Sequence, residues 1–163
     1  MQRVVDAAPL ILLAKVDALE LLRLGSEAVL APLEVLSEVD QGADVAAARV
    51  RLARTQWLQE CHARTPLPSL PEALGAGERA VLEQALTLGE VQVVSDDLVA
   101  RRAALRLGLT PIGTIGILLM AKRVGAIASV SEYLRALRAM GMYLSETLIE
   151  RVLAEAGERE LSE

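Results

Sequence analysis

The sequence has little of what several common kinds of functional site require. Among its 163 residues there is one cysteine, Cys61, one histidine, His62, and no phenylalanine. A single cysteine excludes a disulfide within the chain and fits a reducing cytoplasm. One cysteine and one histidine cannot supply the ligands of a zinc site. A lone histidine also lacks the orienting partners of a catalytic triad, so we expect His62 to be an ordinary surface residue.

The chain also lacks a segment that is long enough to cross a membrane. Its most apolar window, residues 107–121, has 15 residues and contains three glycines and a proline. A transmembrane helix needs about 20 apolar residues. No secretory signal is visible, because the acidic Asp6 precedes any long apolar run. We therefore expect a soluble cytoplasmic protein that has no membrane partner.

What the chain does contain is the material of one globular domain. Apolar residues make up 53% of it and charged residues 24%, which excludes an intrinsically disordered chain. With three aromatic side chains, the core must be built from Leu, Val, Ile and Ala. The net charge of -5 argues against a general electrostatic attraction to nucleic acid. We expect a single domain over residues 1–163, with C-terminal helices at about 129–158 packed on it.

Short apolar segments that resemble strands alternate with segments of helical character. This alternation predicts an α/β fold of three layers, in which helices cover both faces of a central parallel sheet. Residues 60–74 contain three prolines and are expected to be mostly loop, with room for a short strand. The expected strands are residues 3–5, 28–30, 91–94 and 109–112. The expected helices are residues 9–14, 18–24 (capped by Asp17), 32–39, 44–58, 77–88, 97–107, 113–124, 130–140 and 145–156.

Acidic residues directly follow two of the expected strands. Asp6 comes after the first strand, and Asp96 and Asp97 come after residues 91–94. Both strands are short and apolar, so we expect them to be central and adjacent or nearly so. Carboxylates that meet at one sheet edge repel each other unless a proton or a cation such as Mg²⁺ or Mn²⁺ lies between them. Taken alone, each aspartate is better explained as a simple helix N-cap, and only the combination favours a cation site, so both interpretations stay open.

Five short motifs stand in order along the chain, at residues 4–11 (Val-Val-Asp-Ala-Ala-Pro-Leu-Ile), 32–38 (Pro-Leu-Glu-Val-Leu-Ser-Glu), 75–78 (Gly-Ala-Gly-Glu), 95–102 (Ser-Asp-Asp-Leu-Val-Ala-Arg-Arg) and 112–118 (Ile-Gly-Thr-Ile-Gly-Ile-Leu). Together with Ala121, Lys122, Gly125 and the tail at 148–158, they resemble the motifs of a bacterial and archaeal branch of the PIN-domain nucleases. The resemblance spans essentially the whole chain.

This resemblance implies an α/β/α sandwich whose acidic residues meet in one pocket and bind Mg²⁺ or Mn²⁺. It implies hydrolysis of phosphodiester bonds in single-stranded RNA. Many members of the family are toxins of the VapC type that pair with a small antitoxin protein, and many form dimers. The residues that would hold the metal are Asp6, Glu38, Glu78, Asp96 and Asp97. Asp6, Glu38, Glu78 and Asp97 would be catalytic, with Asp97 favoured over Asp96 as the ligand.

Other polar residues would support this site. Ser95 and Thr114 offer hydroxyl groups, although Thr114 is equally compatible with a turn or cap. Three basic residues would hold the RNA backbone, namely Arg101, Arg102 and Lys122. Solvated helix faces with ordinary ion pairs are the alternative for all three. Taken singly, Glu38 would be a solvated helix residue and Glu78 a stabilising charge near a helix N-terminus.

Two competing functions stay open at this stage. Ala8 stands where the family has Ser or Thr before the proline, which favours a catalytically weak or inactive PIN-like protein that binds RNA or another partner. A phospho-accepting receiver domain is the second alternative. That fold has paired acids after its first strand and a lysine just after its last strand, whereas Asp6 is single and Lys122 lies inside an expected helix. The apolar faces of the last two helices either pack on the core or bind a second copy or an antitoxin.

Overall fold

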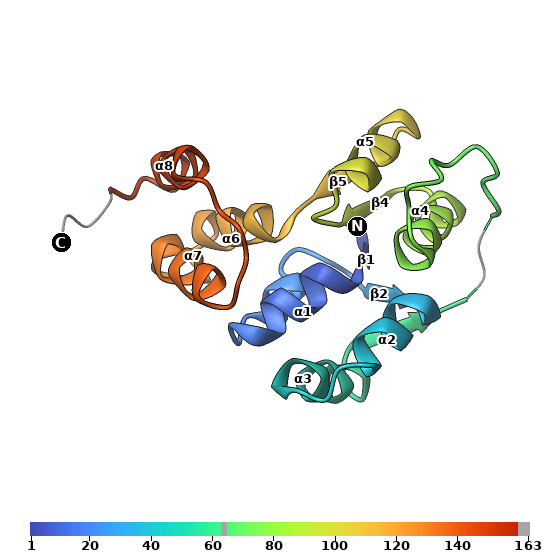
Figure 1. Cartoon of the computed structure of the whole chain (residues 1–163), viewed down its shortest axis with the longest axis horizontal. Coiled ribbons are helices and arrows are strands. Elements are labelled where there is room, and N and C mark those ends of the chain that lie inside the picture. The colour runs from blue at the N-terminus through green and yellow to red at the C-terminus, as the bar shows by residue number, and fades with distance from the viewer. Residues whose placement is uncertain (63–64, 160–163) are drawn as a thin grey trace.

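The computed structural model describes residues 1–62 and 65–159, and it has the layered α/β architecture that the alternating pattern predicts. Five parallel strands form one sheet in the order β3-β2-β1-β4-β5. Helices flank the sheet on both sides (Figure 1). The strands are β1 (Gln2–Val5), β2 (Val29–Pro32), β3 (Leu58–Cys61), β4 (Val91–Val94) and β5 (Thr110–Ile112).

The two strands that precede the candidate acids are central and adjacent, as predicted. β1 pairs with β4 in parallel, with Val5 opposite Val94. Both valines are fully buried, because helices cover the sheet on each side and the central strands face no solvent. The register places Asp6 and Ser95, the residues that follow these valines, side by side at the carboxyl edge of the sheet. Ligands bind at this edge in open parallel sheets.

The helices form the two outer layers of the sandwich. α4 packs across β1, β2 and β4, and α5 packs against β5 on the same side (Figure 1). α1, α3 and α6 lie on the other side of the sheet (Figure 1). The helices of the described residues are α1 (Ala7–Lys15), the 3₁₀ turn η1 (Leu19–Arg23), α2 (Leu33–Asp40), α3 (Val45–Arg54), α4 (Ala76–Leu88), α5 (Leu98–Arg106), α6 (Thr114–Arg123), α7 (Val130–Ala139) and α8 (Glu146–Glu155).

α7 and α8 pack on α6 and extend the molecule away from the sheet (Figure 1). The residues after α8 return to the start of α7. The carboxylate of Glu158 accepts hydrogen bonds from the backbone N–H groups of Val130 and Ser131 and pairs with Lys122 at 3.3 Å. Glu158 therefore satisfies backbone donors that a helix N-terminus otherwise leaves unpaired, and it fixes the end of α8 to α6 and α7.

Three local expectations are wrong. The first helix begins at Ala7 rather than at Pro9, because the side chain of Asp6 accepts from the Ala7 N–H and starts the helix earlier. Asp17 does not cap the next turn: its φ is 56°, and the N-cap is Ala18 with no side-chain bond.

The third wrong expectation concerns the long helix that was to end at Leu58. α3 ends at Arg54, and Leu58–Cys61 instead form β3, which pairs in parallel with Val29–Pro32. Pairing with a strand 29 positions earlier in the chain outweighs the local helical pattern. Residues 63 and 64 of the expected loop lie outside the described residues.

Candidate active site

Asp6 is the centre of the acidic group at the carboxyl edge of the sheet. Its side chain is almost fully buried, with 4% of the residue exposed. Oδ1 accepts from the Ala7 N–H at 2.8 Å, and Oδ2 accepts from the Ser95 hydroxyl at 3.1 Å. Asp6 is thus a helix cap, but one that is held in the sheet edge by a second, equally buried residue from β4. An ordinary N-cap on a surface helix needs no such partner.

The carboxylate of Glu38 reaches the same place from α2. A Cβ atom on Gly77 would lie 3.3 Å from Glu38 Oε2 and 3.6 Å from Asp6 Oδ1. Both oxygens therefore face one point above the first turn of α4, and the lack of a side chain at position 77 leaves that point open. Glu78 folds back over the same turn, since its Oε2 lies 2.6 Å from where a Cβ on Gly75 would be.

This crowding of acids changes the protonation of Asp6. Burial, together with the negative charges of Glu78 and Glu38, raises the pKa of Asp6 to about 6, against the hydrogen bonds from Ala7 and Ser95. The ionised form of Asp6 is thus disfavoured by its surroundings. A proton or a cation close to Asp6 would offset that cost.

The two aspartates after β4 have different partners. Asp97 caps α5, with Oδ1 accepting from the Ala100 N–H at 2.7 Å, and no described residue donates to its Oδ2. Asp96 uses both oxygens on Thr114, accepting from the backbone N–H at 2.7 Å and from the hydroxyl at 2.6 Å. Asp96 therefore joins the end of β4 to the start of α6. The hydroxyl of Thr114, which is fully buried, is already engaged in this contact.

The three predicted RNA-binding residues lie in different places. Arg101 is half-buried, and its Nη1 lies 3.5 Å from where a Cβ on Gly113 would be, next to Asp96. Arg102 is exposed on the same helix. Neither arginine forms an ion pair with a described residue. Lys122 is eight positions along α6 from Thr114, or about 12 Å, and pairs with Glu158. The structure brings Arg101 to the acids and does not bring Lys122.

The side chains at this edge suit a hard divalent cation in their chemistry. Asp6, Glu38, Glu78 and Asp97 offer carboxylate oxygens, which Mg²⁺ and Mn²⁺ prefer, and Mg²⁺ keeps several waters when it is bound. Within residues 1–62 and 65–159, no three Asp, Glu, His or Cys side chains already stand close enough to hold an ion. The two that converge most clearly are Asp6 and Glu38, on the open point at Gly77.

Two glycines have roles that the sequence reasoning missed. Gly77 leaves space for Asp6 and Glu38, and Gly113 leaves space for Asp96, whose Oδ1 would lie 2.9 Å from an added Cβ. In the sequence, both glycines stand out only as members of the motifs at residues 75–78 and 112–118. The available signal was a glycine inside a helix, at Gly77, where it costs stability relative to alanine and so calls for a reason.

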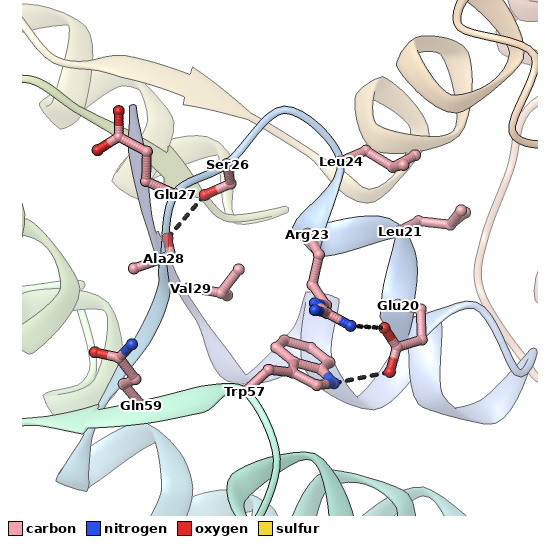
Figure 2. Close-up of a pocket in the computed structure, with 10 residues that line it drawn as sticks. All are labelled: Glu20, Leu21, Arg23, Leu24, Ser26, Glu27, Ala28, Val29, Trp57 and Gln59. Carbon is pink, nitrogen blue, oxygen red and sulfur yellow. Dashed lines mark hydrogen bonds and ion pairs between the residues drawn. The ribbon is translucent and has the colours of Figure 1, made fainter.

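A cavity of about 540 Å³ opens at the opposite, amino edge of the sheet, between η1 and the starts of β2 and β3 (Figure 2). Its polar groups bond one another. The Trp57 indole N–H donates to Glu20 at 2.8 Å, and Arg23 pairs with the other oxygen of Glu20 and lies over the Trp57 ring (Figure 2). No cluster of acids faces this cavity, so the carboxyl edge is the better candidate for chemistry.

Comparison with known proteins agrees with the geometry. A family model described as a PIN domain matches residues 2–158, a range that includes every candidate acid. No curated protein matches the chain. In the part of the chain that the structure describes, no helix is both long enough and apolar enough to span a bilayer.

Proposed function

The chain belongs to the PIN-domain family, and we propose that it is a metal-dependent ribonuclease that hydrolyses phosphodiester bonds in single-stranded RNA. PIN domains are typically nucleases, bind nucleic acids and generally use divalent metal ions. The observation that carries the proposal is the convergence of Asp6 and Glu38 on the open point at Gly77, at the ligand-binding edge of the sheet.

Four of the five acids would be metal ligands, and the fifth, Asp96, would be a positioning residue. Asp6, Glu38, Glu78 and Asp97 would hold Mg²⁺ or Mn²⁺, which when bound neutralises phosphate charge and acidifies water. Glu38 or Glu78 would accept the proton of the attacking water, because neither has a hydrogen bond to a described residue that fixes its carboxylate. Arg101 would contact the phosphate from the side of Asp96.

Ser95, Asp96 and Thr114 would act as positioning residues. The Ser95 hydroxyl orients Asp6 through the 3.1 Å bond, and its oxygen also accepts from the Asp97 N–H at 3.3 Å. The Asp96–Thr114 pair fixes the start of α6 against β4. Asp6 and Asp97 are thus linked through Ser95, which would hold the two ligands in a fixed position relative to each other.

The test is cleavage of a mixed single-stranded RNA in the presence of Mn²⁺, Mg²⁺ or EDTA, with wild-type protein beside Asp6→Asn and Asp97→Asn. We expect cleavage only with metal, and a loss of at least about 100-fold in each variant. Asp44→Asn is the matched control, because Asp44 caps α3 in the same way and stands outside the acidic group. Absence of cleavage by folded wild-type protein with every ion would overturn the proposal.

The alternative of an RNA-binding protein without cleavage is favoured by Ala8, which removes a hydroxyl from the opening motif. Metal-independent RNA binding in the same assay, with no cleavage, is the result that would select it. The family resemblance also leads us to propose a homodimer and a toxin paired with an antitoxin. The mass in solution tests the first, and a small neighbouring gene for a DNA-binding protein tests the second.

A further inference from the structure

A groove of about 390 Å³ adjoins the acidic group on the side of α6 and α8. Its volume is in the range of sites that bind small molecules or single chemical groups. One end is formed by Asp96, Arg101 and Gly113, and the other end by α8. The groove therefore starts at the aspartate that joins β4 to α6. Its apolar lining includes Ile112, Ile115, Leu119, Met142, Leu148 and Val152.

Two arginines and two acids line the groove, and the two arginines are available to a ligand. Arg101 at one end and Arg151 at the other form no ion pair with any residue among 1–62 and 65–159. The two acids of the lining are engaged elsewhere, since Asp96 bonds to Thr114 and Glu155 faces Arg123 at 3.8 Å. A ligand in this groove would meet an aliphatic surface between two unpaired guanidinium groups.

Two glycines, one between β5 and α6 and one in the first turn of α6, form part of the groove. A Cβ on Gly116 would lie 2.6 Å from Ile112 Cγ1, so only glycine allows α6 to approach β5 as it does. Gly113 and Gly116 both line the groove, so at these two positions its surface is backbone. Met142 lies in the opposite wall, in the loop before α8, and its flexible thioether adapts to the ring of a ligand.

We propose that this groove holds a base of the RNA chain beside the scissile phosphate, with Arg101 and Arg151 on the phosphates at either side of that base. A nucleotide combines a planar apolar ring with an anion, which matches an aliphatic groove between two unpaired arginines. Continuity with the acidic group selects a nucleic acid over other anions. This inference rests on the proposed function, because the ligand of the groove is the same RNA.

The groove predicts weak discrimination among bases. Apart from the charged residues Asp96, Arg101, Arg151 and Glu155, its lining is apolar, so most of a base in the groove would meet a surface that does not read hydrogen-bonding groups. Proteins that bind single strands without sequence preference usually stack bases on aromatic rings, and this chain has only three. Aliphatic and methionine contacts would take that role here.

Binding is measured with a fluorescein-labelled single-stranded RNA of mixed sequence, by anisotropy in EDTA and again in Ca²⁺, with the RNA checked to be intact. We expect Arg151→Glu to weaken binding at least about 5-fold and to lower the slope of log K against log salt by about one. Arg135→Glu is its control: Arg135 is exposed on α7, is unpaired among the described residues and does not line the groove.

The base contact is tested separately. Met142→Ala should weaken RNA binding about 5-fold, whereas Met140→Ala, an exposed methionine outside the groove, should not. The Met142→Ala effect should shrink when the RNA is replaced by an abasic oligomer of equal length. Equal weakening of both oligomers would overturn base binding, as would equal competition by polyglutamate, which supplies charge without a ring.

The outcomes separate this inference from the proposed function. If the groove variants bind RNA as wild type does while Asp6→Asn abolishes metal-dependent cleavage, the groove assignment is wrong and the nuclease stands. If the groove variants weaken binding while wild-type protein cleaves nothing, the groove stands and the nuclease fails. Folded wild-type protein that binds no RNA in either buffer overturns the groove assignment.

Discussion

The two ends of β1 each carry a buried charge, and the two charges are accommodated in opposite ways. Arg3, near the start of β1, is 2% exposed, and Asp6, which directly follows β1, is 4% exposed. Removing either charge from water is costly unless polar partners replace the water. Arg3 has found such partners, and Asp6 is surrounded by further acids.

Arg3 has a neutral acceptor for most of its donors. Nε donates to Gln92 at 2.7 Å, Nη1 donates to the carbonyls of Leu22 at 2.7 Å and Leu24 at 2.6 Å, and Nη2 contacts the sulfur of Met120 at 3.2 Å. No described carboxylate pairs with it, and burial lowers its pKa. These bonds join β1 to β4, η1 and α6, so Arg3 holds the fold together.

The surroundings of Asp6, in contrast, do not stabilise its negative charge. Its hydrogen bonds from Ala7 and Ser95 are outweighed by burial and by the nearby Glu78 and Glu38, so its pKa is raised to about 6. Perturbed ionisable groups of this kind cluster at functional sites, although structural networks can also produce them. The contrast with Arg3 supports a functional interpretation, because Arg3 shows that this fold can provide a buried charge with hydrogen-bond partners.

The strongest test of this contrast is Arg3→Met, which keeps most of the packing volume and removes every donor. The carbonyls of Leu22 and Leu24 and the amide oxygen of Gln92 would lose their bonds, at about 1–3 kcal/mol for each buried acceptor that stays unpaired. We expect the free energy of unfolding to fall by about 4 kcal/mol in urea titrations.

The control for this change is Arg102→Met, on the exposed face of α5, which should alter the free energy of unfolding by less than about 0.5 kcal/mol. A loss below about 1 kcal/mol for Arg3→Met would mean that the buried guanidinium contributes packing alone. The contrast between the two ends of β1 would then disappear.

At the other end of the strand, Asp6→Asn should stabilise the protein at pH 7. The folded state binds the Asp6 proton more tightly than the unfolded state, whose pKa is near 3.8, so wild-type stability falls as pH rises from about 4 to about 6. A shift of this size corresponds to a cost on the order of 3 kcal/mol above pH 6. Weaker hydrogen bonds to the amide reduce the expected gain for Asp6→Asn to about 1–3 kcal/mol.

The measurement is the difference in unfolding free energy between Asp6→Asn and wild type, taken from pH 4 to pH 7.5 so that other carboxylates cancel. The difference should grow with pH up to about pH 6 and then stay constant. Millimolar Mn²⁺ or Mg²⁺ at pH 7 should raise wild-type stability and leave Asp6→Asn nearly unchanged. A difference that does not depend on pH would show that Asp6 ionises as it does in water.

The sequence predicts where Asp6 lies at one end of β1, but it does not predict the hydrogen-bond partners of Arg3 at the other end. Apolar strands at 3–5 and 91–94 predicted that Asp6 and the Asp96–Asp97 pair would follow adjacent strands at one edge of the sheet, and the pairing of the strands confirms that they are adjacent. Nothing local marks Arg3 as buried, because its acceptors come from η1, β4 and α6, up to 117 positions away. β3 was anticipated only as room for a short strand within residues 60–74, for the same reason, since among the described strands it pairs with β2 alone.

The candidate site shows the same limit. Strand ends place Asp6, Ser95 and Asp96 without any knowledge of tertiary contacts, whereas the approach of Glu38 depends on how α2 crosses α4 at Gly77. For Lys122 the sequence left two interpretations open, a contact with the RNA backbone and an ordinary ion pair on a helix face. Its actual partner, Glu158, lies 36 positions later, after a helix whose packing the motif does not specify.

The finest test of the acidic end is Gly77→Ala, for which we expect a small effect on stability and a larger one on metal. Alanine in a helix is favoured over glycine by about 0.5–1 kcal/mol, while the new methyl group would crowd Glu38 Oε2 at 3.3 Å, so unfolding should change by less than about 1 kcal/mol. The methyl group would occupy the point that Asp6 and Glu38 share, and Mn²⁺ affinity, measured by calorimetry, should fall several-fold. Gly42→Ala is the matched control, because its methyl group would meet the Val39 carbonyl at the same 3.3 Å and Asp44 Oδ1 at 3.6 Å in the loop after α2, outside the group formed by Asp6, Glu38 and Glu78. Unchanged Mn²⁺ affinity in Gly77→Ala would place the ion away from Asp6 and Glu38, and the raised pKa of Asp6 would then be a consequence of burial in the fold, as the lowered pKa of Arg3 is.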